Sequence, residues 1–206
     1  MKQIIKDTVV LTLITLIAGL CLGFVHEITK EPIRAAEETA QNKAFLEVMP
    51  GADTFTETKD FSEEAAAAVL EEKGLSGAEI SGSFSALDAS GSQIGTVVNV
   101  TATEGYGGDI GFSMGIDKDG TILGISILSI NETAGLGMNA KSDDQWRSQF
   151  YQGTDTTYVV GKDASGTEGE TIIDALSGAT ITSRAMTKGV NAGIGYFKSL
   201  GGGTNE

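Results

Sequence analysis

The sequence is poor in cysteine and histidine, with one of each, Cys21 and His26, among 206 residues. No intrachain disulfide can form, and this chain alone cannot supply a Cys/His zinc site, an iron–sulfur site or a histidine-ligated haem site. His26 lies beside an apolar N-terminal run, so the rest of the chain has no histidine for a Ser–His–Asp or Cys–His hydrolase. We expect neither catalytic residues of that kind nor a metal site, and a bound cofactor would carry any demanding chemistry.

Basic residues are also scarce, because Lys and Arg number 14 against 28 Asp and Glu, which gives a net charge of -14. Proteins that bind nucleic acid usually carry a basic patch, so we exclude nucleic acid as a partner. The acidic surface mainly keeps the protein soluble. Since 40% of the residues are hydrophobic, the chain can fill a core, which argues against disorder throughout.

Charged residues are absent from Thr8 to Val25, an apolar run of about the minimum length for a membrane-spanning helix. Lys2 and Lys6 precede the run, which favours a cytoplasmic N-terminus and export of the remainder. Basic residues also follow the run closely, so charge alone supports this orientation weakly. We expect a single-pass membrane anchor.

Three other interpretations of this run are disfavoured. A cleaved signal peptide would be followed by small residues, whereas Phe24, Val25 and His26 stand there. A lipoprotein would carry a small residue before Cys21, where Leu20 stands instead. The length and the terminal position argue against a buried core helix. Cys21 is then a small apolar residue of the anchor rather than a reactive thiol.

Beyond the anchor, the pattern predicts helices, then a run of strands, then helices. Helices are expected over Thr29–Met49 and Phe61–Lys73, ended by Pro50 and Gly74. Segments rich in Val, Ile and Thr predict strands over Ala78–Leu87, Ser92–Thr103, Ile110–Asp117 and Thr121–Ile130. This order indicates an α+β fold with a mainly antiparallel sheet flanked by helices.

The C-terminal third predicts three further elements. Asp143–Tyr151 is expected to be a short helix with Trp146 and Phe150 in the core. Thr157–Val160 is expected to be a strand, and Thr182–Leu200 an amphipathic helix.

The first candidate site is the stretch Asp174–Ser183, DALSGATITS, directly before and at the start of that last helix. Free N–H groups at a helix start, together with the helix dipole, form an anion site, so a phosphate fits here despite the acidic surface. The residues alone favour an ordinary turn that has its N-cap at Thr182 or Ser183, because helix caps of this kind are common.

This stretch resembles the flavinylation motif of the FMN-binding domain in the Rnf and Nqr ion-pumping redox complexes. That motif has an Asp, two or three variable positions and then Ser-Gly-Ala-Thr, and here it runs from Asp174 to Thr180. Its Thr/Ser continuation also matches, at Thr182 and Ser183. The resemblance implies that Thr180 carries FMN as a phosphodiester, attached by a separate flavin transferase that uses FAD.

The second stretch, Asn131–Gly137, reads NETAGLG where the family usually has Glu-Thr-Pro-Gly-Leu-Gly, so Ala134 replaces a proline. The resemblance implies that Glu132 and Thr133 approach the flavin ring and that Leu136 lies beneath it. Residues 135–140 also match a G-x-G-x-x-A dinucleotide fingerprint. No βαβ alternation precedes them, so this second interpretation is disfavoured.

The third stretch is residues 105–110, GYGGDI, which is similar to a Gly-Tyr-Gly-Gly element of the family. Tyr106 is a candidate for stacking on the flavin, and the alternative is a bulge or tight turn. Beside Thr180, the expected cofactor-binding residues are therefore Ser177, Gly178, Ala179, Thr182, Ser183, Glu132, Thr133, Leu136, Gly137, Tyr106 and Gly107.

The resemblance covers roughly residues 1–200, and the length favours the shorter Rnf component, called the G subunit. It implies an electron-transfer subunit of a membrane-bound, ion-translocating ferredoxin:NAD oxidoreductase complex, with other subunits of that complex and the flavin transferase as partners. The FMN domain would lie on the outer face of the cell membrane. The expected organisation is a cytoplasmic stub and anchor at 1–25, a helical connector at 26–77, an FMN-binding domain at 78–200 and a flexible tail at 201–206.

Two alternatives belong to other classes of protein. One is a membrane-anchored module that binds an anion or nucleotide without a covalent bond, through the helix start near Thr182. The other is a structural subunit that holds larger partners together.

Overall fold

A computed structural model describes residues 2–59, 61–161, 163, 165 and 168–201 of the chain. The chain forms two compact units, Met1–Ala40 and Gln41–Glu206. The first unit is part of one long helix, α1 (Lys2–Val48), whose apolar stretch is long enough to cross a membrane and has none of its residues buried in the protein. The helix predicted over Thr29–Met49 is present as the second part of α1, which continues through Pro32 and ends at Val48. A proline removes one hydrogen bond, which a helix of this length tolerates locally.

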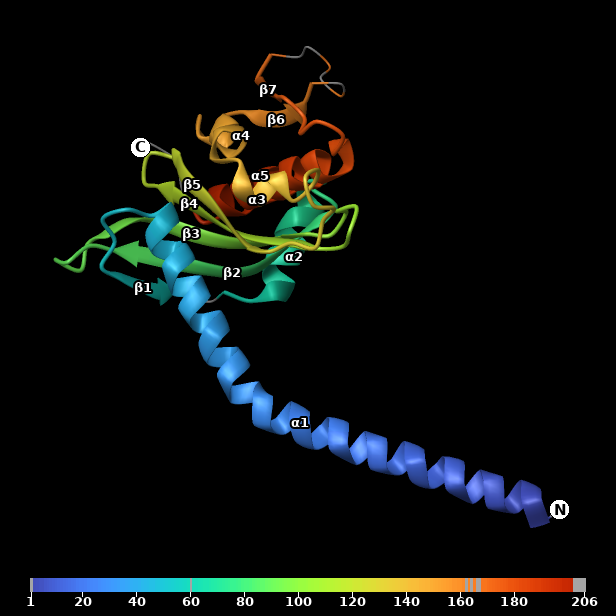
Figure 1. The fold of residues 1–206 in the computed structure, drawn as a ribbon. Helices are drawn as coiled ribbons and strands as arrows, with labels where there is room; N and C mark the ends of the chain where they lie inside the picture. Colours follow the sequence, from blue (N-terminus) through green and yellow to red (C-terminus); the bar gives the residue numbers. More distant parts are fainter. Residues whose placement is uncertain (1, 60, 162, 164, 166–167, 202–206) are drawn as a thin grey trace. The chain divides into compact units, whose positions relative to one another are not determined.

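A five-stranded antiparallel sheet forms the centre of the second unit (Figure 1). Its strands follow one another in sequence order: β1 (Thr54–Glu57), β2 (Ala78–Leu87), β3 (Gln93–Ala102), β4 (Ile110–Asp117) and β5 (Ile122–Ser129). The four predicted strands and the antiparallel arrangement are confirmed, and β1 is an additional short strand.

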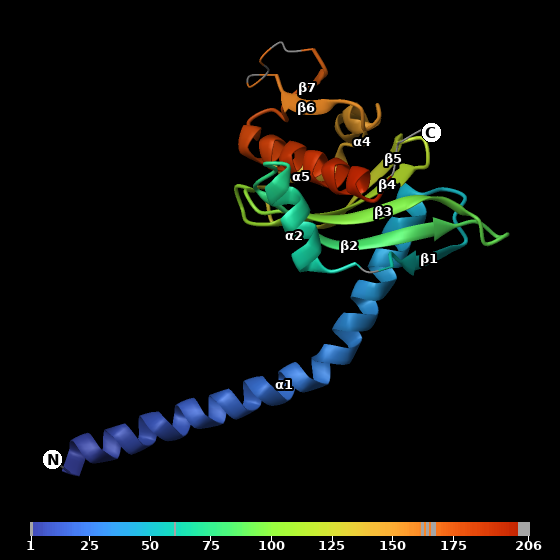
Figure 2. The same cartoon turned by 180° about the vertical axis from the view of Figure 1, so that it is seen from behind.

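One face of this sheet packs against α5 (Thr180–Ser199), and α2 (Glu63–Glu72) lies beside α5 and β2 (Figure 2). The core between them includes Val98, Phe112 and Met114 from the strands and Met186 and Val190 from α5, all fully buried. The predicted helix over Phe61–Lys73 is confirmed as α2, with Ser62 as its N-cap.

The end of α1 covers part of the opposite face, where Phe45, Val48 and Met49 are buried with Val97 of β3. Gly115 and Gly124 are cross-strand neighbours beneath it. A Cβ atom at Gly115 would lie 2.1 Å from the carbonyl oxygen of Val48, so the helix backbone rests directly on the backbone of β4. Glycine at this position is therefore required by packing.

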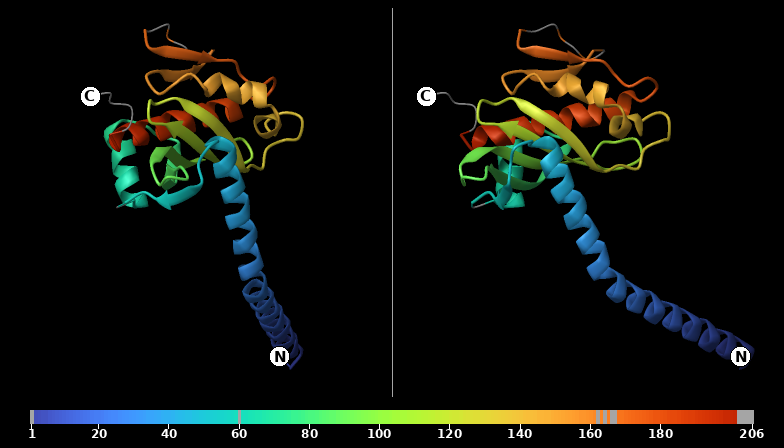
Figure 3. Two further views of the ribbon diagram at one scale, coloured as in Figure 1. Left: turned by 90° about the vertical axis from the view of Figure 1, so that its left-hand side faces the viewer. Right: turned by 60° about the vertical axis from the view of Figure 1, so that its left-hand side comes forward.

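A second, two-stranded parallel sheet lies on the other side of α5, as the views of Figure 3 show. Its strands are β6 (Thr157–Val160) and β7 (Glu170–Ile173), and β7 was not predicted. Asn191 of α5 holds β6 by two hydrogen bonds, accepting from the Tyr158 N–H at 3.0 Å and donating to the Tyr158 carbonyl at 2.8 Å. The helix is thus enclosed between two sheets.

Short helical segments connect the two sheets: α3 (Asn139–Ser142), α4 (Asp144–Arg147) and the 3₁₀ turn η1 (Ser148–Phe150). The helix predicted over Asp143–Tyr151 is present as α4 and η1, with a tighter last turn. Trp146 and Phe150 are buried with ring centroids 5.5 Å apart, which confirms their prediction as core residues.

Candidate functional site

A pocket of about 530 Å³ lies at the N-terminal end of α5. The loop between β3 and β4 and the segment after β5 leave the sheet at the same end, so both reach this pocket. Its lining comes from three separate parts of the sequence: Tyr106; Glu132, Thr133, Leu136 and Gly137; and Gly178, Ala179, Thr180, Ile181 and Thr182. These are the three stretches that the sequence singled out, although 26 to 76 residues separate them along the chain.

Thr180 is the first residue of α5, and its N-cap, Ala179, has no side chain that could satisfy the free N–H groups. The helical hydrogen bonds begin only with the Ser183 N–H, which donates to the Ala179 carbonyl at 3.0 Å. The N–H groups of residues 180–182 are therefore available to an anion, and no acidic residue lies in the first turn to compete with it.

The expected start of this helix, with an N-cap at Thr182 or Ser183, is wrong, because α5 begins two residues earlier. Thr182 and Ser183 lie within the first turn and are buried. The Ser183 hydroxyl donates to the Ala179 carbonyl at 3.0 Å and accepts from the Leu176 N–H at 2.9 Å. It holds the preceding loop in place and does not line the pocket.

Residues of α4 and η1 also hold the loop before Thr180 in place. Trp146 Nε1 donates to the carbonyl of Asp174 at 2.7 Å, and the Asp174 N–H donates to Gln149 Oε1 at 2.8 Å. Gly178 has a φ of +71°, a conformation that glycine adopts without strain. These bonds fix the path of the backbone that presents the Thr180 hydroxyl.

Glycines allow the β3–β4 loop and the segment after β5 to approach each other, and the start of α5, at close range. A Cβ atom at Gly107 would lie 1.9 Å from the carbonyl oxygen of Asn131, and one at Gly137 would lie 2.6 Å from Glu132 Oε2 and 2.7 Å from Thr182 Oγ1. The Gly107 N–H donates to Glu132 Oε1 at 3.2 Å, which orients that carboxylate at the pocket.

The turn that carries Ala134 in place of proline is intact. The Thr133 carbonyl accepts hydrogen bonds from the N–H groups of Leu136 at 3.1 Å and Met138 at 3.2 Å. Gly135 adopts a φ of +76° in this turn. Leu136 is therefore presented at the pocket without help from a proline ring.

The mouth of the pocket is apolar, with Tyr106 71% exposed, Ile181 48% and Leu136 42%. Ile181 was not singled out from the sequence, although an apolar residue directly after the motif threonine is a usable signal. Ser177 and Gly107 do not line the pocket, but each directly precedes or follows a residue that does. Among the described residues, no cluster of three or more His, Cys, Asp or Glu could hold a metal ion.

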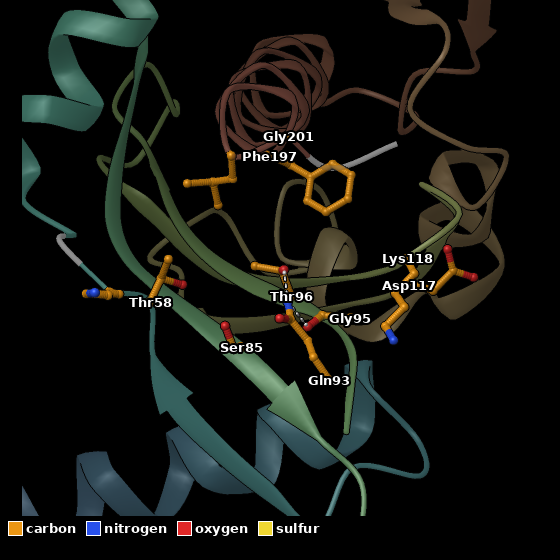
Figure 4. A pocket seen from close by; sticks show the side chains of 11 residues that line it. Thr58, Ser85, Gln93, Gly95, Thr96, Asp117, Lys118, Phe197 and Gly201 are labelled. Carbon is orange, nitrogen blue, oxygen red and sulfur yellow. Dashed lines mark hydrogen bonds between the residues drawn. The ribbon is translucent and has the colours of Figure 1, made fainter. Parts of the chain in front are cut away.

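A second pocket, of about 460 Å³, lies at the opposite end of α5, where Phe197 and Gly201 face Thr96 and Gln93 (Figure 4). Thr180 and Phe197 are about 25 Å apart along the helix, at 1.5 Å per residue. Lys59 and Lys118 line the second pocket together with Asp117, but it lies at a helix C-terminus, which is less favourable for an anion than the helix start at Thr180. The pocket beside Thr180 is therefore the better candidate for a phosphate-bearing cofactor.

FMN fits the residues of this first pocket. Its volume falls in the range of about 300–1,000 Å³ that cofactor sites usually have. The uncapped start of α5 suits a phosphate, while Tyr106, Leu136 and Ile181 offer apolar surface for a ring system.

Comparison with known proteins agrees with this geometry. Residues 105–195 match the FMN-binding domain family, and residues 1–48 match the family described as the RnfG N-terminal region. The G subunit of the Na(+)-translocating ferredoxin:NAD(+) oxidoreductase complex of Acetobacterium woodii is 31% identical over 201 residues, covering 97% of this chain and 94% of the relative.

Two further proteins are similar over shorter lengths. The G subunit of the proton-translocating ferredoxin:NAD(+) oxidoreductase complex of Clostridium ljungdahlii is 43% identical over 101 residues, covering 49% of this chain and 52% of the relative. A crystal structure of Shewanella oneidensis NqrC is 26% identical, with a TM-score of 0.44 and coverage of 58% of each chain.

The matched families cover both the N-terminal apolar helix and the domain that builds the pocket, and the similarity to the Acetobacterium woodii protein extends over nearly the whole chain. The helix fits a single-pass anchor in a membrane complex. The chain belongs to the family of Rnf complex G subunits, the FMN-binding redox subunits of ion-translocating ferredoxin:NAD oxidoreductase complexes.

Proposed function

We propose that this protein carries FMN joined through its phosphate to the hydroxyl of Thr180 and passes electrons between other centres of the complex. The observation that carries the proposal is the position of Thr180. It is the first residue of an uncapped helix and lines the pocket where all three motif stretches meet. A phosphate on this hydroxyl would lie beside the free N–H groups of residues 180–182.

The attachment requires a flavin transferase and FAD as the donor. A new bond forms between Thr180 Oγ1 and the phosphorus on the FMN side of the FAD pyrophosphate. The pyrophosphate bond breaks, AMP leaves, and the hydroxyl proton is released to solvent. The loop before Thr180 is accessible for this reaction, because Ser177 and Gly178 are exposed. Hydrogen bonds from Trp146 and to Gln149 hold the backbone of Asp174 in place.

When bound, FMN supplies the electron-transfer chemistry, and the protein binds and orients it. The start of α5 would hold the phosphate, and Leu136 and Ile181 would offer apolar contact to the ring. The Glu132 carboxylate, oriented by the Gly107 N–H, would place a negative charge at the pocket. That charge would make reduction of the flavin less favourable.

The covalent bond also suits the proposed location of the domain on the outer face of the membrane, with the N-terminus in the cytoplasm. A tethered cofactor cannot diffuse away from the cell, and it stays at high effective concentration near its partner centres. The short basic N-terminus, with Lys2 and Lys6, supports this orientation.

The experiment is the intact mass of the denatured full chain produced together with its flavin transferase. We expect an increase of about 440 Da, one FMN less one water, located on the peptide that contains Thr180. The Thr180→Val variant should lack this increase and retain the fold, because valine has a similar shape and loses only the hydroxyl.

Thr182→Val is the matched control, since Thr182 lies in the same helical turn and lines the same pocket. It should retain the mass increase. An unmodified wild-type chain, made with a transferase that modifies a control substrate, would favour the alternative of an anion-binding module without a covalent bond. A chain that binds no flavin in any form would favour the purely structural role.

A further inference from the structure

The N-terminal half of β2 is an open edge of the large sheet. Strand β1 pairs only with Phe84–Leu87 of β2, and the Thr58 N–H donates to the Ser83 carbonyl at 2.8 Å. Residues 78–82 of β2 therefore have β3 on one side and, within the described chain, no strand on the other.

The register shows which backbone groups face outward. The Gly77 carbonyl accepts from the Thr103 N–H of the neighbouring chain segment at 3.0 Å. Hydrogen-bonded and non-hydrogen-bonded pairs alternate along an antiparallel ladder, so Ala78 and Ile80 direct their N–H and C=O groups to the open side. Among the described residues, no backbone hydrogen bond from another segment satisfies these groups. Such an edge is a template for an additional strand.

A groove of about 570 Å³ runs between this edge and α2, which lies beside the same half of β2 in Figure 2. Its apolar surface comes from residues such as Ala67, Leu70 and Leu75. Four glutamates also line it: Glu63, Glu64, Glu71 and Glu79. Among the described residues, no lysine or arginine lines the groove, and none forms an ion pair with any of the four glutamates.

The helix dipole accounts for Glu63 and Glu64, which lie in the first turn of α2 behind its Ser62 N-cap. It does not account for Glu71, in the last turn, where a carboxylate is unfavourable, or for Glu79 on β2. These two residues come from different elements and place their charges on the same groove. The charge complements a basic partner.

The groove ends close to the flavin pocket. A Cβ atom at Gly77, next to the groove residue Ala78, would lie 2.8 Å from the Glu104 carboxylate. Glu104 belongs to the β3–β4 loop, which contributes Tyr106 to the pocket two residues later. A protein segment bound in the groove would thus bring its own subunit next to the mouth of the pocket.

We propose that this groove docks an extended segment of another subunit of the complex, rich in lysine or arginine, which pairs with residues 78–82 of β2 as an added strand. The functional importance of this docking rests on the proposed function, because it places a redox partner beside the flavin of this protein. The backbone of β2 provides the pairing, and Glu71 and Glu79 select a basic segment.

The first test is amide hydrogen exchange of the full chain, alone and in the assembled complex. We expect the peptide that covers residues 76–83 to exchange at least about tenfold more slowly in the complex, because strand pairing protects outward N–H groups. Peptides of β4, which lies in the interior of the sheet, should be protected in both states and serve as the internal reference. Equal exchange of residues 76–83 in both states would overturn the proposal.

The second test reverses the charge of the groove in the full-length holoprotein with the double variant Glu71→Lys and Glu79→Lys. We expect the double variant to lose the added protection of residues 76–83 in the complex. We also expect the rest of the complex to reduce its flavin at least about tenfold more slowly at low salt. The control is Glu72→Lys, the same type of substitution at one exposed residue of the same helix that does not line the groove. It should leave both measurements unchanged.

Protection that persists in the double variant would overturn the basic segment as the occupant. Protection that rises with the concentration of the isolated protein would identify a second copy instead. Neither exchange measurement requires the flavin, so a failure of flavin attachment, read from the intact mass, is separable from a failure of docking.

Discussion

The residue type at several positions of the pocket is determined by the space available for a side chain as well as by its polarity. Gly107 and Gly137 permit the β3–β4 loop, the segment after β5 and the start of α5 to approach one another within normal contact distance. Glu132 is fixed between two of these segments by its bond to the Gly107 N–H. Ser183, one turn into α5, ties the helix to the loop before it. The position of Thr180 at the pocket thus depends on packing and hydrogen bonds made by other residues.

Replacement of Glu132 by glutamine tests the effect of its charge. The amide oxygen can still accept from the Gly107 N–H, so the loop geometry is preserved while the negative charge is lost. We expect the flavin reduction potential to rise by on the order of 30 mV, which corresponds to about 1.4 kcal/mol for a two-electron couple. Redox titration of the holoprotein measures this change, and covalent attachment should persist.

Glu132→Ala, which removes both charge and acceptor, should shift the potential in the same direction and also lower the thermal stability of the holoprotein. A potential that is the same in all three proteins would show that Glu132 does not face the flavin ring.

At the scale of the elements, the predictable parts are those whose pattern is local. Strands β2–β5 are separated by segments rich in Gly, Asp and Ser, and β3 and β5 are rich in Val, Ile and Thr, so their positions could be read from the sequence. Strands β1 and β7 are only four residues long and owe their conformation to a partner strand, which no local pattern reveals. The start of α5 was placed too late because Ala179 is a poor N-cap by composition.

The contact between the end of α1 and the sheet gives a prediction at this scale. Gly115→Ala would place a methyl group 2.1 Å from the Val48 carbonyl oxygen, so the helix end must move off the sheet. We expect destabilisation by about 1–3 kcal/mol or more, as for overpacked cores. Urea unfolding of the full chain in detergent measures this loss.

Gly161→Ala is the matched control for that experiment. Among the residues that the structure describes, a Cβ atom at Gly161 would meet nothing closer than 3.4 Å, an ordinary contact distance. The free energy of unfolding of this variant should stay within about 1 kcal/mol of wild type. Alanine lowers the entropy of the unfolded chain, which offsets a small cost of fitting the methyl group. Equal destabilisation by both substitutions would contradict the importance of the α1 contact.

Tyr158 of β6 gives a prediction about pH. Its hydroxyl is directed at the carbonyls of Phe150 and Gly153, at 2.8 Å and 2.9 Å, and accepts from the Gln152 N–H at 3.3 Å. Burial raises the pKa of this phenol above its ordinary value of 10.0, partly offset by its hydrogen bonds. Because the pKa of Tyr158 is raised in the folded state, its contribution to the free energy of unfolding is fully present below the unfolded-state pKa. This contribution is lost as the pH rises through the folded-state pKa.

We therefore expect Tyr158→Phe to lower the free energy of unfolding by about 1–3 kcal/mol at neutral pH, where it leaves buried polar groups unsatisfied. The difference between variant and wild type should narrow above about pH 10, where unfolded tyrosine ionises. Urea unfolding across this pH range tests the expectation, and a difference that stays constant would assign the effect to packing alone.

For the whole molecule, three short motifs separated along the chain predicted most of the pocket lining, because each carries residues with a specific backbone or chemical role. Ile181 was missed because its side chain alone does not distinguish it from a core residue, and the signal was its position directly after Thr180. The enclosure of α5 between an antiparallel and a parallel sheet was also not predictable, since it depends on contacts such as Asn191 with β6.

The orientation in the membrane is a prediction at the same scale. A reporter enzyme that is active only outside the cytoplasm, fused after the last residue, should be active, and one fused before Met1 should be inactive. The physical reason is the retention of the basic N-terminus on the cytoplasmic side. The reverse pattern of activity would place the flavin domain in the cytoplasm and remove the argument for tethering the cofactor.

The uncapped start of α5 has a consequence for how the cofactor responds to acidity. Free FMN is a phosphate monoester with a second ionisation near pH 6, so its charge changes between about -1 and -2 over the physiological range. A diester with Thr180 has no second ionisation and keeps one negative charge beside the free N–H groups of the helix. Flavin held only by the helix start should dissociate more readily as the pH falls from about 8 to 5, whereas the tethered flavin keeps the same electrostatic anchoring throughout.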